Sequence, residues 1–274
     1  MRSTFGVALA LATALTLSFL LLPILAIFVD IPPGELLAGM NDPAAVDALL
    51  VTLKTTLIAN AVILLVGTPA AYWIATHPVR AKPLLVTAIE LPLVLPPAVA
   101  GIGLLAAFGR VGLLGGTLDV LGLSIPFTQL AVVFAVMFVA SPFYVRAAIS
   151  AFESVDPALT GAARTLGAGP ARTFFRVALP LASGGLGAGW ALCFARGIGE
   201  FGATIMFAGS LQGVTQTLSL AVYEQFDVAF DVALAIGAEL VVISAFLLLA
   251  VKLVPTWTRS SSPSTTLSAP FGSS

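Results

Sequence analysis

Six long apolar segments, separated by short polar or Gly/Pro-rich breaks, dominate the pattern of the chain. They span residues 5–28, 50–75, 84–108, 127–149, 181–198 and 228–254. A helix needs about 20 mostly apolar residues to cross the hydrocarbon core of a bilayer. Strands of a membrane barrel would alternate at every second residue, whereas residues 57–66 and 240–251 are continuously apolar. The pattern therefore predicts an all-α, polytopic membrane helix bundle with about six transmembrane helices.

The basic residues predict the orientation of this bundle, because short loops rich in Lys and Arg stay in the cytoplasm. Nine of the twelve basic residues fall on one side: Arg2, Arg80, Lys82, Arg146, Arg164, Arg172, Arg176, Lys252 and Arg259. The opposite loops are mainly acidic. We therefore expect both termini in the cytoplasm. A cleaved signal peptide is the alternative for residues 1–29, but the apolar stretch exceeds a typical signal core and no small-x-small site follows it.

Composition excludes several classes of protein. The chain is 59% hydrophobic and 9% charged, where a soluble domain carries about 25% charge. A net charge of -1 argues against nucleic acid as a partner. The single cysteine, Cys193, and the single histidine, His77, exclude an internal disulfide framework and a His-rich metal site. We expect no catalytic residues, no metal site and no cofactor bound by this chain.

The segment 150–180 between the fourth and fifth apolar segments is the one long cytoplasmic connection. Asp156 followed by Pro157 is typical of a helix start, since the carboxylate caps free N–H groups and proline suits the first turn. Gly167 can end this helix in the left-handed conformation. Pro170 then starts a second short helix, which we expect Pro180 to stop before the next span. On this evidence alone, an amphipathic hairpin lying on the membrane or on its own bundle would fit equally well.

The order of residues here resembles the EAA loop of permease subunits of ABC importers. Gly161-Ala162-Ala163-Arg164-Thr165-Leu166-Gly167 is followed, after nine residues, by Val177-Ala178-Leu179-Pro180. The resemblance implies a type I importer permease whose coupling helix docks on a cytoplasmic ATPase. The implied coupling residues are Asp156, Pro157, Ala162, Ala163, Arg164, Leu166, Gly167, Phe174, Phe175, Leu179 and Pro180. Gly161 departs from the family pattern, which has glutamate there.

Energy for transport must come from another polypeptide, because the sequence contains no G-x-x-x-x-G-K-[ST] phosphate loop. The resemblance implies a homodimer with the pathway at the subunit interface, two cytoplasmic ABC ATPase subunits that use ATP and Mg, and an extracytoplasmic substrate-binding protein. It also implies a multi-pass protein of a bacterial or archaeal plasma membrane, surrounded by lipid. We divide the chain into residues 1–49 (first transmembrane helix and loop), 50–254 (transporter domain) and 255–274 (disordered cytoplasmic tail).

Two further motifs indicate the substrate class. Both motifs resemble permeases for tetrahedral oxyanions, and they resemble the molybdate and tungstate members more than the sulfate members. They are Glu90-Leu91-Pro92-Leu93-Val94-Leu95-Pro96-Pro97-Ala98-Val99-Ala100-Gly101 and Gly199-Glu200-Phe201-Gly202-Ala203-Thr204-Ile205-Met206. A delivery protein that carries molybdate is therefore the implied partner. A sulfate or other oxyanion permease is one alternative, and an ion-coupled secondary carrier is a more distant one.

The candidate translocation path or gate combines the prolines that bend the third segment with the residues around Glu200. Arg196 and Glu200 are four residues apart, so their side chains can pair, and we favour a structural pair at the gate over direct substrate binding. Glycines of the fifth segment either let helices approach closely or line a passage. The candidate residues are Pro96, Pro97, Arg196, Glu200, Phe201, Gly202, Thr204 and Ser210.

Overall fold

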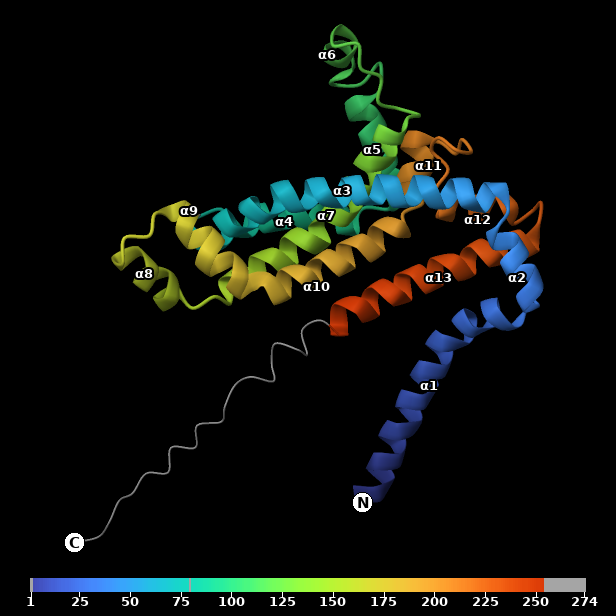
Figure 1. Ribbon diagram of the computed structural model, residues 1–274, viewed down its shortest axis with the longest axis horizontal. Coiled ribbons are helices and arrows are strands. Elements are labelled where there is room, and N and C mark those ends of the chain that lie inside the picture. The colour runs from blue at the N-terminus through green and yellow to red at the C-terminus, as the bar shows by residue number, and fades with distance from the viewer. Residues whose placement is uncertain (1, 79, 254–274) are drawn as a thin grey trace.

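The computed structural model describes residues 2–78 and 80–253, and every regular element in this part of the chain is helical (Figure 1). The predicted disordered tail, residues 255–274, lies outside the described residues. The elements are α1 (Arg2–Val29), α2 (Pro33–Met40), α3 (Pro43–Thr76), α4 (Lys82–Val94), α5 (Pro97–Phe108), α6 (Gly115–Val120), α7 (Gln129–Glu153), α8 (Pro157–Thr165), α9 (Pro170–Thr173), the π-helical turn η1 (Phe174–Ala178), α10 (Leu179–Ile198), α11 (Gly202–Ala208), α12 (Leu218–Gln225) and α13 (Phe230–Leu253).

In the described part of the chain, five helices are long and apolar enough to cross a membrane: Thr4–Val29, Pro43–Thr76, Gln129–Glu153, Pro170–Ile198 and Phe230–Ala250. The bent pair α4 and α5 makes a sixth if it is counted as one span. The predicted all-α bundle of about six spans is therefore confirmed.

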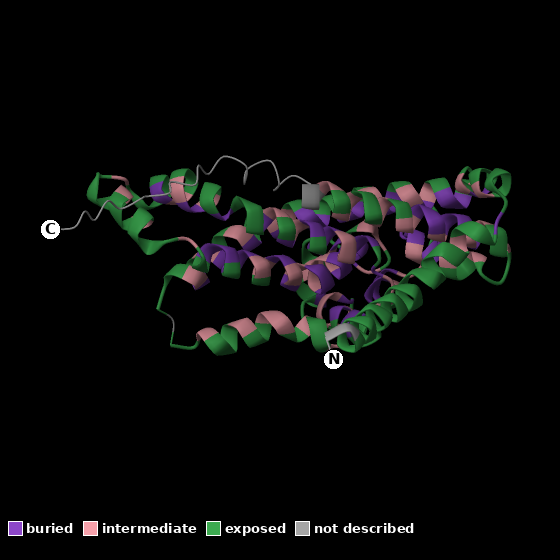
Figure 2. Ribbon diagram, turned by 90° about the horizontal axis from the view of Figure 1, so that it is seen from below, coloured by how far each residue is buried: buried purple, intermediate pink, exposed green. Residues whose placement is uncertain are grey.

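Buried residues gather in the interior of the bundle (Figure 2), and the core lies where α7 packs between α3 and α10. Small residues permit this packing: a Cβ added at Gly185 would lie 2.6 Å from the Cβ of Ala151, and one at Gly189 would lie 2.6 Å from the Cβ of Ala147. Close backbone approach of this kind is the usual basis of helix association in lipid. These two glycines therefore serve packing between α7 and α10.

A polar contact crosses the same core. The hydroxyls of Thr68 on α3 and Tyr144 on α7 share a hydrogen bond of 2.6 Å, and Tyr144 is only 1% exposed. A buried hydroxyl without a partner would be costly in a membrane. The bond thus sets the register of α3 against α7.

A second, smaller cluster covers the end of the bundle at which α3 begins, where α12 and α13 also pack. Its buried residues are Ala45, Ala48, Leu218, Ala221 and Ile236. The hydroxyl of Thr52 accepts a hydrogen bond of 2.8 Å from the N–H of Leu218. This bond satisfies a free donor at the start of α12 and joins α12 to α3.

The helix α1 lies apart from this core. Its apolar window has no buried residue, and Figure 2 shows it exposed beside the N label. A helix that is apolar all round requires apolar surroundings. The outward side chains of α1 therefore suit a lipid environment.

The prolines of the third apolar segment break it, as the sequence predicts. α4 ends at Val94, α5 begins at Pro97, and the two axes differ by 112°. Pro92 remains inside α4, so the break belongs to Pro96 and Pro97. α5 consequently leaves the direction of the bundle and projects from it with α6 at its far end (Figure 1).

The expected proline stop before the fifth span is wrong. The helix runs without a break from Pro170 to Ile198, and Pro180 lies in the first turn of α10. The wider turn η1 precedes it, where the N–H of Leu179 bonds to the carbonyl of Phe174. Because proline lacks an N–H and its ring crowds the preceding turn, this π-helical turn explains how the helix continues.

Candidate docking helix and membrane gate

The ends of α8 are formed by the residues that the sequence singles out. Oδ1 of Asp156 accepts a hydrogen bond of 2.8 Å from the N–H of Ala158, and Pro157 occupies the first turn. At the other end Gly167 has a φ of 82°. The N–H groups of Gly167 and Ala168 bond to the carbonyls of Arg164 and Ala163, each at 3.0 Å, which is a Schellman cap. The predicted start and end of this helix are confirmed.

No residue of α8 is buried. The side chain of Leu159 is 49% exposed and that of Leu166 is 87% exposed. An apolar face packed on its own bundle would hide these leucines, so the alternative of packing on the bundle is wrong, whereas a position on the membrane surface stays a prediction. Ala162, Arg164 and Leu166 instead lie on a preformed surface at one end of the molecule (Figure 1).

A cavity of about 340 Å³ separates α8 from the end of the bundle. Its lining includes Tyr72, Thr76, Thr160, Gly161 and Arg164. A Cβ added at Gly161 would have no atom within 4 Å. The position at which related loops carry glutamate is thus open space in this chain.

Aromatic rings anchor the helix that returns from α8. The ring centroid of Phe174 lies 4.8 Å from that of Tyr72 on α3 and 6.2 Å from that of Phe152 on α7. Phe175 is 63% exposed, and Leu179 packs against the core. The predicted coupling residues therefore divide into an outward group on α8, joined by Phe175, and an inward group, Phe174 and Leu179.

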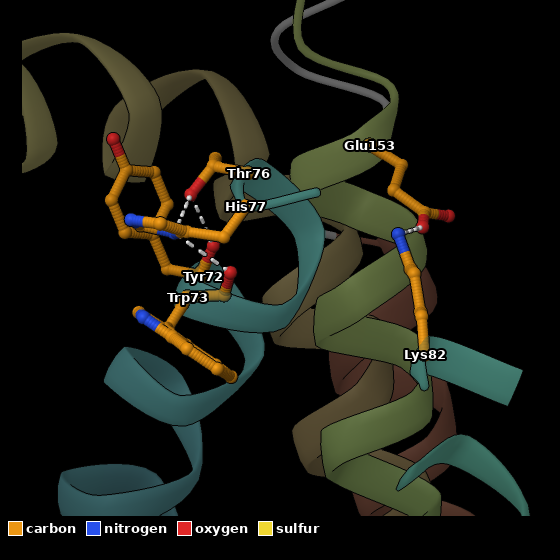
Figure 3. A network of polar contacts seen from close by, with 6 residues as sticks. All are labelled: Tyr72, Trp73, Thr76, His77, Lys82 and Glu153. Carbon is orange, nitrogen blue, oxygen red and sulfur yellow. Dashed lines mark hydrogen bonds and ion pairs between the residues drawn. The ribbon is translucent and has the colours of Figure 1, made fainter. Parts of the chain in front are cut away.

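An ion pair fastens the same end of the bundle (Figure 3). Nζ of Lys82, at the start of α4, lies 2.7 Å from Oε1 of Glu153, at the end of α7. His77 ends α3 and its Nδ1 lies 3.0 Å from the carbonyl oxygen of Trp73. His77 thus has a local structural role at a helix end.

The predicted pair of Arg196 and Glu200 is present. Nη2 of Arg196 lies 2.6 Å from Oε2 of Glu200, although α10 already ends at Ile198. Oε1 of Glu200 accepts a hydrogen bond of 2.7 Å from the N–H of Ala203. Glu200 is 1% exposed. The guanidinium neutralises its buried charge as an ion pair, and the first turn of α11 holds Oε1.

α5 and α11 meet beside this pair with very little space between them. A Cβ at Gly202 would lie 2.5 Å from the Cβ of Pro97, and one at Gly101 would lie 2.7 Å from the carbonyl oxygen of Ala203. The structure therefore brings Pro97, Arg196, Glu200 and Gly202 together.

The remaining gate candidates are not part of this group of four residues. The ring of Phe201 packs on Tyr223 of α12 at 5.3 Å, and Pro96 is exposed in the break between α4 and α5. Thr204 Oγ1 and Ser210 Oγ are buried and have no hydrogen-bond partner among the described residues.

One contributor to the site, Gly101, and one contact of Glu200 escape the sequence reasoning. Gly101 fits against Ala203, and its only signal is that it closes the proline-rich motif. Glu200 holds the first turn of α11, yet glutamate is not a preferred capping residue, so the sequence gives no local sign of this contact.

Comparison with known protein families and sequences identifies the class of this membrane protein. Residues 63–259 match the model of the family described as binding-protein-dependent transport system inner membrane component. The chain belongs to this family. It is therefore a multi-pass membrane protein of the transport permease class. The chain is 42% identical over 233 residues to the molybdenum transport system permease protein ModB of Mycobacterium tuberculosis, and the match covers 85% of this chain and 88% of that protein.

Solved structures agree with the fold. A bacterial ABC transporter involved in the import of the acidic polysaccharide alginate superposes with a TM-score of 0.70 at 16% identity, covering 94% of this chain and 97% of that chain. The MetNI methionine ABC transporter, in an inward-facing conformation, gives a TM-score of 0.60 at 19% identity, covering 77% and 94%. At these identities the likeness shows the permease fold alone.

Proposed function

We propose that this chain is the transmembrane permease subunit of an ATP-driven importer of molybdate. The observation that carries the proposal is the 42% identity, over 85% of the chain, to a molybdenum transport permease. The motifs that begin at Glu90 and Gly199 lie within the paired elements α4, α5 and α11, which is where a path through the bundle would be controlled.

The geometry of α8 supports coupling to a separate ATPase. A short helix that is capped at both ends and exposed along its length is preorganised for docking, so that little ordering entropy is lost on binding. ATP and Mg are used in that partner, and two copies of this permease, each with one ATPase subunit, form the transporter. An extracytoplasmic binding protein delivers molybdate to the opposite face.

This assembly places α8 in the cytoplasm, together with both termini, in a bacterial or archaeal plasma membrane. Arg164, on the exposed helix, and the paired Lys82 lie at the α8 end of the molecule, in agreement with the excess of basic residues on cytoplasmic loops. The transporter domain, residues 50–254, then contains both the docking helix and the gate.

Reconstitution tests the proposal. The permease is purified with its ATPase, inserted in liposomes and supplied with binding protein loaded with molybdate, tungstate or sulfate. ATP hydrolysis and uptake stimulated by the molybdate-loaded or tungstate-loaded protein alone is the expected result. Equal stimulation by sulfate would replace molybdate with a broader oxyanion class, and failure of any ATPase to co-purify would refute coupling through α8.

A further inference from the structure

Arg196 borders a pocket inside the bundle, at the break between α4 and α5. The pocket has a volume of about 120 Å³ and is lined by Pro92, Leu93, Leu95, Pro97, Val139, Phe143 and Arg196. Among these described residues Arg196 alone carries a charge. A charged group among mainly apolar side chains is one feature of small-ligand sites.

The guanidinium of Arg196 has donors to spare. It carries five N–H groups, and its only described side-chain partner is Oε2 of Glu200, reached through Nη2. A bidentate contact, which would use two donors on one carboxylate, is not formed by these atoms. Because a charged group inside a membrane is costly unless paired, the unused donors favour an additional or a replacing anion.

Glu200 can give up Arg196 without losing every partner. Its other oxygen, Oε1, accepts the N–H of Ala203 at 2.7 Å, so the carboxylate stays held at the first turn of α11. Thr204 belongs to the same turn, and its buried hydroxyl has no hydrogen-bond partner within the described part of the chain. Without Arg196, Glu200 would thus keep one of its two polar contacts.

We propose that Arg196 is the point inside the permease at which the transported oxyanion binds, and that the oxyanion takes the place of Glu200 on the guanidinium. This rests on the proposed function, since it needs an oxyanion as substrate. A tetrahedral dianion offers more charge and several acceptor oxygens to the planar fork of arginine than one carboxylate oxygen does. Exchange frees Glu200 next to the close contact of Gly202 with Pro97, which links binding to the junction of α5 and α11.

Direct binding of radiolabelled molybdate tests the exchange, using the permease–ATPase complex in nanodiscs without binding protein. Glu200→Gln keeps an acceptor for Ala203 but removes the competing charge, so the affinity should rise by about tenfold or more, the factor set by about 1.4 kcal/mol. Arg196→Gln should abolish binding in the wild-type and Glu200→Gln backgrounds. Arg196→Lys keeps the charge without the fork and should bind more weakly than wild type.

The second Arg–Glu pair of the bundle is the matched control. Nη1 of Arg146 lies 3.1 Å from Oε1 of Glu90, and Glu90→Gln should leave molybdate binding unchanged. Binding that survives Arg196→Gln, or that rises equally in Glu90→Gln and Glu200→Gln, would overturn the proposal. Absence of binding in every variant would overturn it as well.

Two measurements together separate this site from the proposed function. The first is the same binding assay with sodium sulfate, and with sodium chloride at matched ionic strength as the comparison. The second is import by liposomes. If wild-type liposomes import molybdate and the Arg196→Gln liposomes do so equally well, the anion site is wrong and the importer assignment stands. If wild-type liposomes import sulfate but no molybdate, the substrate assignment fails, while binding of sulfate that depends on Arg196 would still support the site.

Discussion

Replacement of Gly167 by isoleucine should uncouple ATP hydrolysis from transport. Gly167 has a φ of 82° at the end of α8, a region that L-residues enter at a cost of about 1–2 kcal/mol, and that is a true outlier for a β-branched side chain. Space is not the obstacle, because an added Cβ would meet no atom within 4 Å. The perturbation therefore acts on backbone conformation alone.

The size of the effect follows from the shortness of the helix. α8 has only nine residues, and helices of this length are marginal without their caps. A cost of 1–2 kcal/mol lowers the ratio of capped to frayed ends by about 5- to 30-fold. Leu166 would then no longer be presented on a fixed turn.

Liposomes that contain the permease and its ATPase provide the assay, and the quantity measured is molybdate imported per ATP hydrolysed. Gly167→Asn is the control, because asparagine tolerates the left-handed conformation, and it should keep the wild-type ratio. A normal ratio in Gly167→Ile would refute the docking role of this helix end.

Three further outcomes are expected. Gly189→Val should lower the unfolding temperature of the complex, because the added Cβ would collide with α7. Gly187→Val is the control and should change the unfolding temperature little, because a Cβ there meets no atom within 4 Å. Equal effects of the two substitutions would contradict the α7–α10 packing. Tyr144→Phe should cost about 0.5–1.5 kcal/mol in denaturant unfolding through loss of its bond to α3, and unchanged stability would show that bond to be dispensable. In right-side-out vesicles a membrane-impermeant maleimide should label Leu113→Cys but not Leu166→Cys, since both positions are largely exposed and the proposed orientation puts them on opposite sides of the membrane. The reverse pattern would invert that orientation.

Local signals in the sequence were sufficient for the spans and for α8. Long apolar runs define α3, α7 and α13 because each must satisfy its own backbone within lipid. Asp156 and Gly167 mark the ends of α8 because capping depends on neighbours within a few residues. These features require no knowledge of what packs against them.

The rest depends on contacts between distant segments. Pro180 carries the same local signal whether a helix stops or widens into a π-helical turn, and in the structure this turn lies where the rings of Phe174, Tyr72 and Phe152 pack together. Likewise, the sequence reveals the prolines at the 112° break between α4 and α5, but not the close fit of Gly101 against α11. Pairwise fit of this kind is not visible in one-dimensional periodicity.

The uninterrupted helix from Pro170 to Ile198 is a direct physical connection between the two candidate functional regions. From Pro170, beside α8, to Arg196 it spans 26 residue steps, or about 39 Å at 1.5 Å per residue. The π-helical turn η1 lies near one end of this helix, where the ring of Phe174 packs on that of Tyr72. One continuous helix therefore connects the region of the exposed helix α8 with the guanidinium of Arg196, which lines the pocket at the broken helix.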